Sequence, residues 1–175
     1  NDRTQESLLK MFNMSGKASF TENISALNLC PLSISYEYDP CDYLKAKEMQ
    51  QKRDNPDYKK QAMDDLVNMQ TGVMGYKGRV IYTITGDIND ELAQIASQTS
   101  NKNEQIELTA KLIDKRIHAN YHIYAINKIA YDLLKGEQRF ENEYSTMEKL
   151  DFEKYLNLQI AKIELVDKDD SYLMK

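Results

Sequence analysis

The sequence has few of the features that mark membrane or nucleic-acid-binding proteins. No apolar run in its 175 residues approaches the ~20 residues that a membrane-spanning helix needs, so we expect no transmembrane segment in this chain. Basic residues are not in excess either, since the net charge is −5. Binding to a phosphate backbone depends on clustered Lys and Arg side chains. Nucleic acid is therefore not an expected partner.

Histidine is scarce, and the two that are present lie close together. His118 and His122 follow Asp114 at four-residue steps, which would place all three side chains on one face of a helix. A zinc-protease helix needs a Glu directly after the first histidine, where this chain has Ala119. A di-iron site needs a Glu three residues before a histidine, and Lys115 stands there. We interpret the three residues as a polar helix face and expect no cofactor; a divalent-metal or small-ligand site on them is the alternative.

Cysteine is equally scarce, because Cys30 and Cys41 are the only two in the chain. They bracket the segment CPLSISYEYDPC, which has neither the CxxC spacing of a redox motif nor the ligands of a metal site. A strand followed by a turn can bring such positions within disulfide range, and closing this loop would stabilise the fold by about 3 kcal/mol. We therefore favour a disulfide over two buried thiols.

A disulfide would place the protein in the periplasm, at the cell surface or among secreted proteins. This localisation presumes that a signal peptide preceded Asn1 and was removed. Reduced cysteines would indicate the cytoplasm instead.

Proline and glycine are few and unevenly placed. All three prolines and five of the six glycines precede residue 87. This shift predicts a small mixed lobe at residues 1–86 and a long-helix region at 87–175, within a single structural unit. Two segments with alternating or β-branched residues, PLSISYEY and RVIYTIT, predict short strands in the lobe.

Local signals predict where several helices begin. Asn55 followed by Pro56 is typical of a helix start, which predicts a helix over 55–70 that packs on the long-helix region. Residues 87–135 contain neither Gly nor Pro, and their apolar stripe is interrupted only between Ile95 and Ile106. They form either one long helix or two.

The last part of the chain is also predicted to be helical. Gly136 is placed to end the preceding helix, and Ser145 with Glu148 forms a capping-box pattern. Residues 155–166 are expected to form a helix, because the spacing of their apolar residues, among them Val166, favours a helix over a strand. The fold class is therefore mainly α with a minor β part: long antiparallel helices in a bundle or hairpin, with a small Cys-bearing lobe of two or more short strands.

Four tyrosines lie near the two cysteines in the sequence: Tyr36, Tyr38, Tyr43 and Tyr58. Tyrosine is favoured at protein interfaces because it buries a large area at a low cost in side-chain entropy. Core packing explains these four equally well. No nucleophile–base or acid–base group can be assembled from the sequence, so we expect a protein partner and no enzymatic activity, with the oligomeric state left open.

In organisation, residues 55–166 resemble the minor pilus subunits of type IV secretion systems, which also combine long polar helices with a small globular appendage. No motif accompanies the resemblance, so it assigns no role to any residue. Our first hypothesis is a non-enzymatic extracytoplasmic interaction or structural protein, as a subunit or accessory factor of a cell-surface or secretion assembly. The alternatives are a helical metal- or ligand-binding module that uses Asp114, His118 and His122, and a cytoplasmic helical adaptor.

Overall fold

The computed structural model is mostly helical. Over the residues that it describes, which are 3–14, 16, 18–163 and 170–174, helix accounts for 61%, in eight α-helices and two short 3₁₀ helices, and two strands form one antiparallel sheet. The strands are β1 (Leu32–Tyr36) and β2 (Val80–Ile84). The expected mainly helical fold with a minor β part is confirmed at this level. None of the described helices is both long and apolar enough to cross a membrane.

The chain folds into two compact units, and each unit contains segments from both halves of the sequence. The first unit comprises residues 1–35 and 81–122, and the second comprises residues 36–80 and 123–175. Neither unit corresponds to the lobe expected at 1–86, because each combines segments from before and after that boundary.

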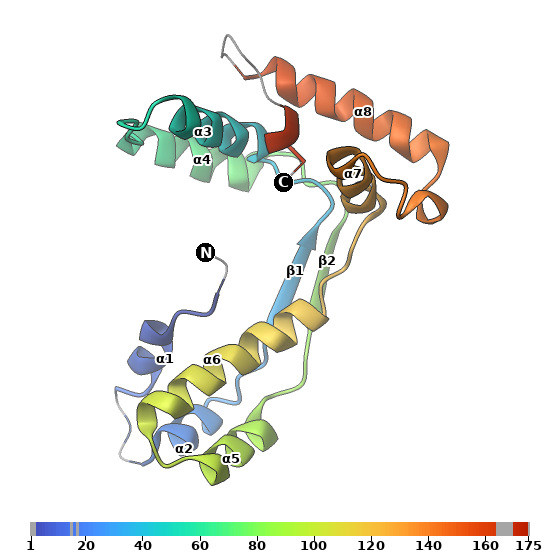
Figure 1. Cartoon of the computed structure of the whole chain (residues 1–175). Helices are drawn as coiled ribbons and strands as arrows, with labels where there is room; N and C mark the ends of the chain where they lie inside the picture. The colour runs from blue at the N-terminus through green and yellow to red at the C-terminus, as the bar shows by residue number, and fades with distance from the viewer. Residues whose placement is uncertain (1–2, 15, 17, 164–169, 175) are drawn as a thin grey trace. The chain divides into compact units, whose positions relative to one another are not determined.

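Four helices build the first unit (Figure 1): α1 (Glu6–Phe12), α2 (Phe20–Ser25), α5 (Asn89–Gln98) and α6 (Lys102–Ala119). A capping box between Ser19 and Glu22 starts α2, and the side chain of Asn101 accepts the first free N–H groups of α6. Apolar side chains from the four helices and from the residue before α5 form one buried core: Leu9, Phe20, Ile24, Ile88, Leu92, Ile106 and Ala110.

Residues 87–135 form three helices, where one or two were expected. The first break, after α5, lies in the polar gap seen in the sequence. The second follows Ala119, where the Asn120 side-chain amide donates to the Arg116 carbonyl at 2.7 Å and the Ser33 hydroxyl donates to the Asn120 carbonyl at 2.8 Å. Side chains therefore satisfy the carbonyls at the end of α6, and no Gly or Pro is needed to stop it.

The second unit is built from four α-helices and two short 3₁₀ helices (Figure 1): α3 (Asp42–Asp54), α4 (Ala62–Met74), α7 (Ala125–Lys135), η1 (Glu141–Glu143), α8 (Thr146–Ala161) and η2 (Asp170–Tyr172). Helix α7 packs on α8, and α3 packs on α8 and η2. The buried apolar side chains of this unit are Cys41, Ala46, Tyr124, Ile129, Phe152, Leu156 and Ile163.

The local signals near the end of the chain are confirmed. Gly136 ends α7 in the left-handed conformation, with φ at 63°. Ser145 and Glu148 form the capping box that starts α8. Helix α8 continues through Ala161, as favoured for this segment, and Val166 lies outside the described residues.

The helix start predicted at Asn55 and Pro56 is wrong. Asn55 ends α3, and its side-chain oxygen accepts the N–H of Asp57 at 3.0 Å, which holds a turn. Asn favours this turn as strongly as it favours a helix N-cap, so the dipeptide alone does not distinguish them. Helix α4 begins only at Ala62.

We expect Leu92→Ala to destabilise the first unit by about 3 kcal/mol, because Leu92 is 0% exposed in the apolar core and its truncation removes buried atoms and leaves a cavity. Urea unfolding followed by far-UV circular dichroism measures this cost. The matched control is Leu158→Ala, because Leu158 is 66% exposed on α8 and its truncation should cost less than about 0.5 kcal/mol. Equal effects of the two substitutions would contradict the core assignment.

Candidate functional site

The structure has both cysteines as free thiols, so the disulfide stays a prediction. Cys30 belongs to the first unit, is exposed, and donates from its sulfur to the Asn28 carbonyl at 3.5 Å. Cys41 belongs to the second unit, is buried, and donates to the Asn68 carbonyl at 3.3 Å. Burial raises the pKa of the Cys41 thiol, which keeps it in the unreactive, protonated form.

The structure does not gather Asp114, His118 and His122 into a metal site, and this site too stays a prediction. Asp114 lies on α6, where one carboxylate oxygen accepts both the N–H and the hydroxyl of Thr4, at 2.8 Å and 2.7 Å. His118 also lies on α6 and is exposed, whereas His122 comes after the end of the helix at Ala119. Among the described residues, no three His, Cys, Asp or Glu side chains form a group that could hold a metal ion.

Two of the four tyrosines singled out in the sequence make ring contacts in the second unit. The Tyr38 ring centre lies 4.3 Å from that of Tyr155 and 5.7 Å from that of Tyr76. The Lys162 ammonium lies 5.0 Å from the centre of the Tyr43 ring. Tyr38 and Tyr155 are distant in the sequence, so no local pattern could identify Tyr155 as a partner.

The other two tyrosines have no ring contact with an aromatic or cationic side chain among those described in the structure. Tyr36 is 43% exposed at the end of β1, and Tyr58 is half-buried in the loop between α3 and α4. The idea that all four tyrosines form one interaction surface stays a prediction.

Asp42 and Tyr155 form the most perturbed titratable pair in the described part of the second unit. The Tyr155 hydroxyl donates to a carboxylate oxygen of Asp42 at the start of α3. Burial raises the pKa of Asp42, although the hydrogen bonds from Tyr155 and from the Tyr43 N–H act in the opposite direction. Burial and the adjacent carboxylate raise the pKa of Tyr155 well above its usual value. Such a tyrosine keeps its proton, and its hydrogen bond to Asp42 links α8 to the start of α3.

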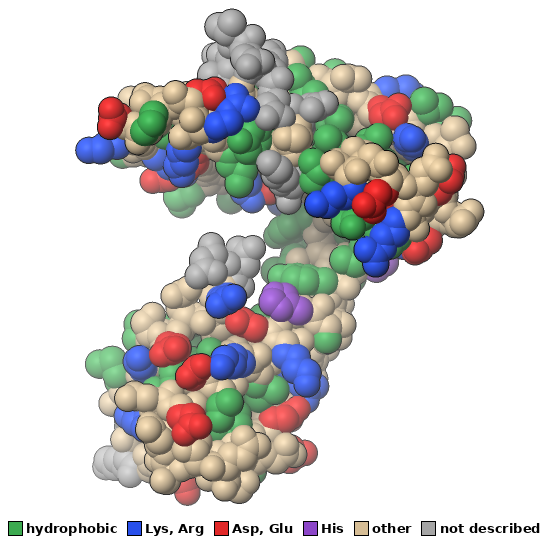
Figure 2. Space-filling model, in the orientation of Figure 1, with side chains coloured by type: hydrophobic (Ala, Val, Ile, Leu, Met, Phe, Trp, Pro, Cys, Tyr) green, Lys and Arg blue, Asp and Glu red, His purple; other side chains and the backbone are tan. Residues whose placement is uncertain are grey.

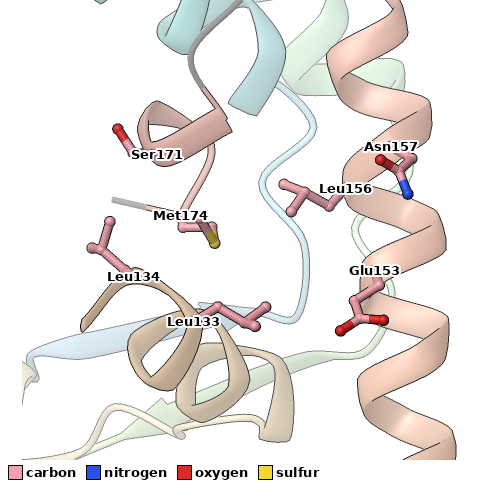
Figure 3. Close-up of a pocket in the computed structure, with 7 residues that line it drawn as sticks. All are labelled: Leu133, Leu134, Glu153, Leu156, Asn157, Ser171 and Met174. Atoms are coloured by element: carbon pink, nitrogen blue, oxygen red, sulfur yellow. The ribbon is translucent and has the colours of Figure 1, made fainter. Parts of the chain in front are cut away.

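A pocket of about 490 Å³ lies in the second unit between α7, α8 and the segment after η2 (Figure 3). It is lined by Leu133, Leu134, Glu153, Leu156, Asn157, Ser171 and Met174. Among the described residues that line it, Glu153 is the one ionisable side chain. These residues therefore offer mainly apolar contact and no acid–base pair.

Helix α4 turns its apolar side to solvent. The six large apolar side chains of α4 fall within roughly 160° of the helix circumference, and all are exposed. We call this set the α4 apolar face: Met63, Leu66, Val67, Met69, Val73 and Met74. No residue of α4 is buried, and the least exposed ones, Asn68, Thr71 and Gly72, lie on the opposite, polar side, toward Cys41. Figure 2 shows hydrophobic side chains at the surface among charged ones in the region of α3 and α4.

Strand β1, like α4, exposes its apolar side chains and buries its polar ones. The alternation expected from the sequence is present, but the apolar Leu32 and Ile34 are exposed while Ser33 and Ser35 are buried. The Thr85 N–H donates to the Pro31 carbonyl at 3.0 Å and the Glu37 N–H to the Arg79 carbonyl at 2.9 Å. This antiparallel register places Leu32 opposite Ile84 and Ile34 opposite Tyr82. Ile84 and Tyr82 are also exposed, so one face of the two-stranded sheet is apolar and open to solvent.

We expect Tyr155→Phe to destabilise the second unit by about 1–3 kcal/mol at pH 7, because it leaves the Asp42 carboxylate without its hydroxyl donor. The hydrogen bond favours the charged carboxyl. The cost should therefore shrink as the pH falls through the raised pKa of Asp42 and the group becomes protonated. Urea unfolding at pH 7 and at pH 3.5 measures the difference. The control is Tyr36→Phe, which should cost little at either pH; a pH-independent cost at Tyr155 would contradict the assignment.

No family model, curated protein or solved structure matches this chain. The resemblance to minor pilus subunits therefore still rests on organisation alone.

Proposed function

We propose that this chain is a non-enzymatic interaction protein that works outside the reducing cytosol, as a subunit or accessory factor of a cell-surface or secretion assembly, and that it binds protein through the α4 apolar face. One observation carries the proposal: six large apolar side chains of a single helix point to solvent while the polar side of the helix packs inward. Burying one such side chain contributes roughly 1.5–3 kcal/mol, so the exposed face favours a state in which it is covered.

The spacing of the face supports this mode of binding. Leu66 and Val67 lie three and four residues after Met63, and Val73 and Met74 lie seven residues after Leu66 and Val67. These are spacings by which a helix docks its apolar side into a groove. The exposed apolar face of the β1–β2 sheet is a second, smaller contact area, carried by the first unit.

The proposal includes a division of roles between two parts of the chain. In it, the helices supply reach and the smaller Cys-bearing part supplies specificity. The packing of α5 on α6 and of α7 on α8, each pair consecutive in the chain, supports the helical part of this description.

The extracytoplasmic location predicts that Cys30 and Cys41 form a disulfide in the protein's native source. Rapid alkylation under denaturing conditions, followed by intact mass with and without prior reduction, measures this. No alkylation before reduction is the expected result. If both cysteines alkylate at once, the chain works in a reducing compartment, and the cytoplasmic adaptor replaces the extracytoplasmic protein as the working hypothesis.

Binding through the α4 apolar face predicts a position-specific cross-link. A photoreactive benzoylphenylalanine in place of Val73, which is 75% exposed, should give an adduct of discrete mass after irradiation in the native source. A second substitution, Leu66→Asp, should abolish the adduct, because it places a charge in the middle of the apolar contact.

The matched control places the same photoreactive residue at Leu158, which is 66% exposed on α8 of the same unit. It should give no discrete adduct. Equal cross-linking from both positions, or none from position 73, would contradict the proposed role of α4. Circular dichroism of each variant verifies that the fold is retained.

A further inference from the structure

The pocket between α7, α8 and the segment after η2 has a mostly apolar wall. Leu133 and Leu134 come from α7, Leu156 from α8 and Met174 from the segment after η2 (Figure 3). Leu156 is buried, and the other three are half-buried. The volume of about 490 Å³ lies within the roughly 300–1,000 Å³ that is typical of small-molecule sites. The wall therefore suits the apolar body of a small ligand.

One carboxylate faces this apolar wall. Figure 3 shows the Glu153 side chain directed from α8 toward Leu133 of α7. Glu153 is half-buried, and within the described part of the chain no ion pair or hydrogen bond engages its carboxylate. A charged group beside an apolar surface loses part of its hydration, and an opposite charge placed next to it offsets that cost. The pocket is therefore complementary to a positive charge.

Glu153 differs in this respect from the other two acidic side chains of α8. Glu148 accepts a hydrogen bond from the Ser145 hydroxyl in the helix cap, at 2.8 Å. Asp151 pairs with Lys154 at 3.0 Å. Lys149, one turn before Glu153, lines a separate pocket beside α7. The carboxylate of Glu153 is thus the one on α8 that an external cation can neutralise.

An apolar wall with one unpaired carboxylate fits a ligand with an apolar body and a single positive charge. We propose that this pocket binds a small organic amine, whose apolar body packs against Leu133, Leu156 and Met174 and whose ammonium group donates to the Glu153 carboxylate. An anionic ligand would be repelled, and a neutral one would leave the carboxylate unpaired. The site lies wholly within the second unit and does not use the α4 apolar face, so it adds ligand binding to the proposed function.

Three probes of similar shape and different charge test this site. The compounds 3-phenylpropylammonium, 3-phenylpropan-1-ol and 3-phenylpropanoate share one apolar body and are positive, neutral and negative at pH 7. Because such a probe has only about ten non-hydrogen atoms, the ammonium should bind weakly, with a Kd of about 0.1–5 mM. The alcohol should bind about three- to tenfold more weakly than the ammonium, and the carboxylate more weakly still.

NMR of the methionine methyl groups in the full chain locates the bound probe. With these methyl carbons labelled, the Met174 signal should shift and saturate over roughly 0.05–20 mM ammonium probe, a range that brackets the expected Kd. Met174→Leu identifies this signal by removing it. Met63 and Met147 are exposed outside the pocket, and their signals should stay in place. Equal shifts at all three residues would indicate adsorption to exposed apolar side chains, and no shift at Met174 would indicate no site; either result overturns the proposal.

Changing the charge at Glu153 tests the ammonium contact. Glu153→Gln should bring the ammonium and the alcohol to equal affinity. Glu153→Lys should reverse the order, so that the carboxylate probe binds about three- to tenfold more tightly than the ammonium. The matched control is Asp151→Asn, which removes an exposed acidic side chain from the same helix and should leave the order unchanged. Circular dichroism verifies the fold of each variant.

Two outcomes of this series contradict the ammonium contact. If the order of the three probes is the same in the natural chain and in both Glu153 variants, the carboxylate plays no part in binding. If Asp151→Asn weakens the ammonium as much as Glu153→Gln does, the preference comes from the net charge of the chain and not from the pocket. Either result overturns the proposal and leaves the position-73 cross-link, and with it the proposed function, untouched.

Discussion

Two backbone groups just beyond the end of α6 determine which face of β1 meets solvent, because serines of β1 form hydrogen bonds with them. The Asn120 carbonyl and the His122 N–H lie beyond the last turn of the helix. Burying either group without a hydrogen-bond partner would cost roughly 1–3 kcal/mol of folding free energy. The hydroxyls of Ser33 and Ser35 satisfy them at 2.8 Å and 2.9 Å. Because residues two apart on a strand share a face, these two contacts turn Leu32 and Ile34 outward. The hydrogen bonds needed by the segment after α6 thus determine which side chains of β1 are exposed.

Helix α4 shows the same preference for inward polar groups. Its contact side carries Asn68, whose backbone carbonyl accepts the Cys41 thiol, and Gly72, where an added Cβ would lie 3.5 Å from that sulfur. Just after the helix, Gly75 lies so close to Pro40 that an added Cβ would come within 2.5 Å of the proline side chain. Small residues therefore let the polar side of α4 approach Cys41 and Pro40, while its large side chains face solvent. The second unit instead gains its apolar burial from Ile129, Phe152 and Leu156.

Features that depend on neighbouring residues could be predicted from the sequence. The Ser145–Glu148 capping box and the left-handed Gly136 are local, and both are present. The mainly helical content and the two strands followed from periodicity. The helix start predicted at Asn55 was wrong because the same short side chain can stabilise either a helix start or a turn.

Features that depend on distant segments could not be predicted. The end of α6 at Ala119 relies on Ser33, and alternation in β1 reveals two faces without revealing which one is covered. For the same reason the sequence drew attention to Tyr38 and not to its partner Tyr155. The candidate site was missed at α4, since an amphipathic pattern alone predicts an inward apolar face.

Half of the α4 apolar face consists of methionine, namely Met63, Met69 and Met74, which are 63%, 69% and 80% exposed. An unbranched thioether adapts to the shape of whatever covers it, which lets one face tolerate small changes in its contact. The same side chains are the ones most open to oxidants, and conversion to the sulfoxide would make each of them polar. The oxidation state of these three sulfur atoms would then decide whether the face is apolar and able to bind, or polar and hydrated. Enzymatic reduction of the sulfoxides would reverse the change.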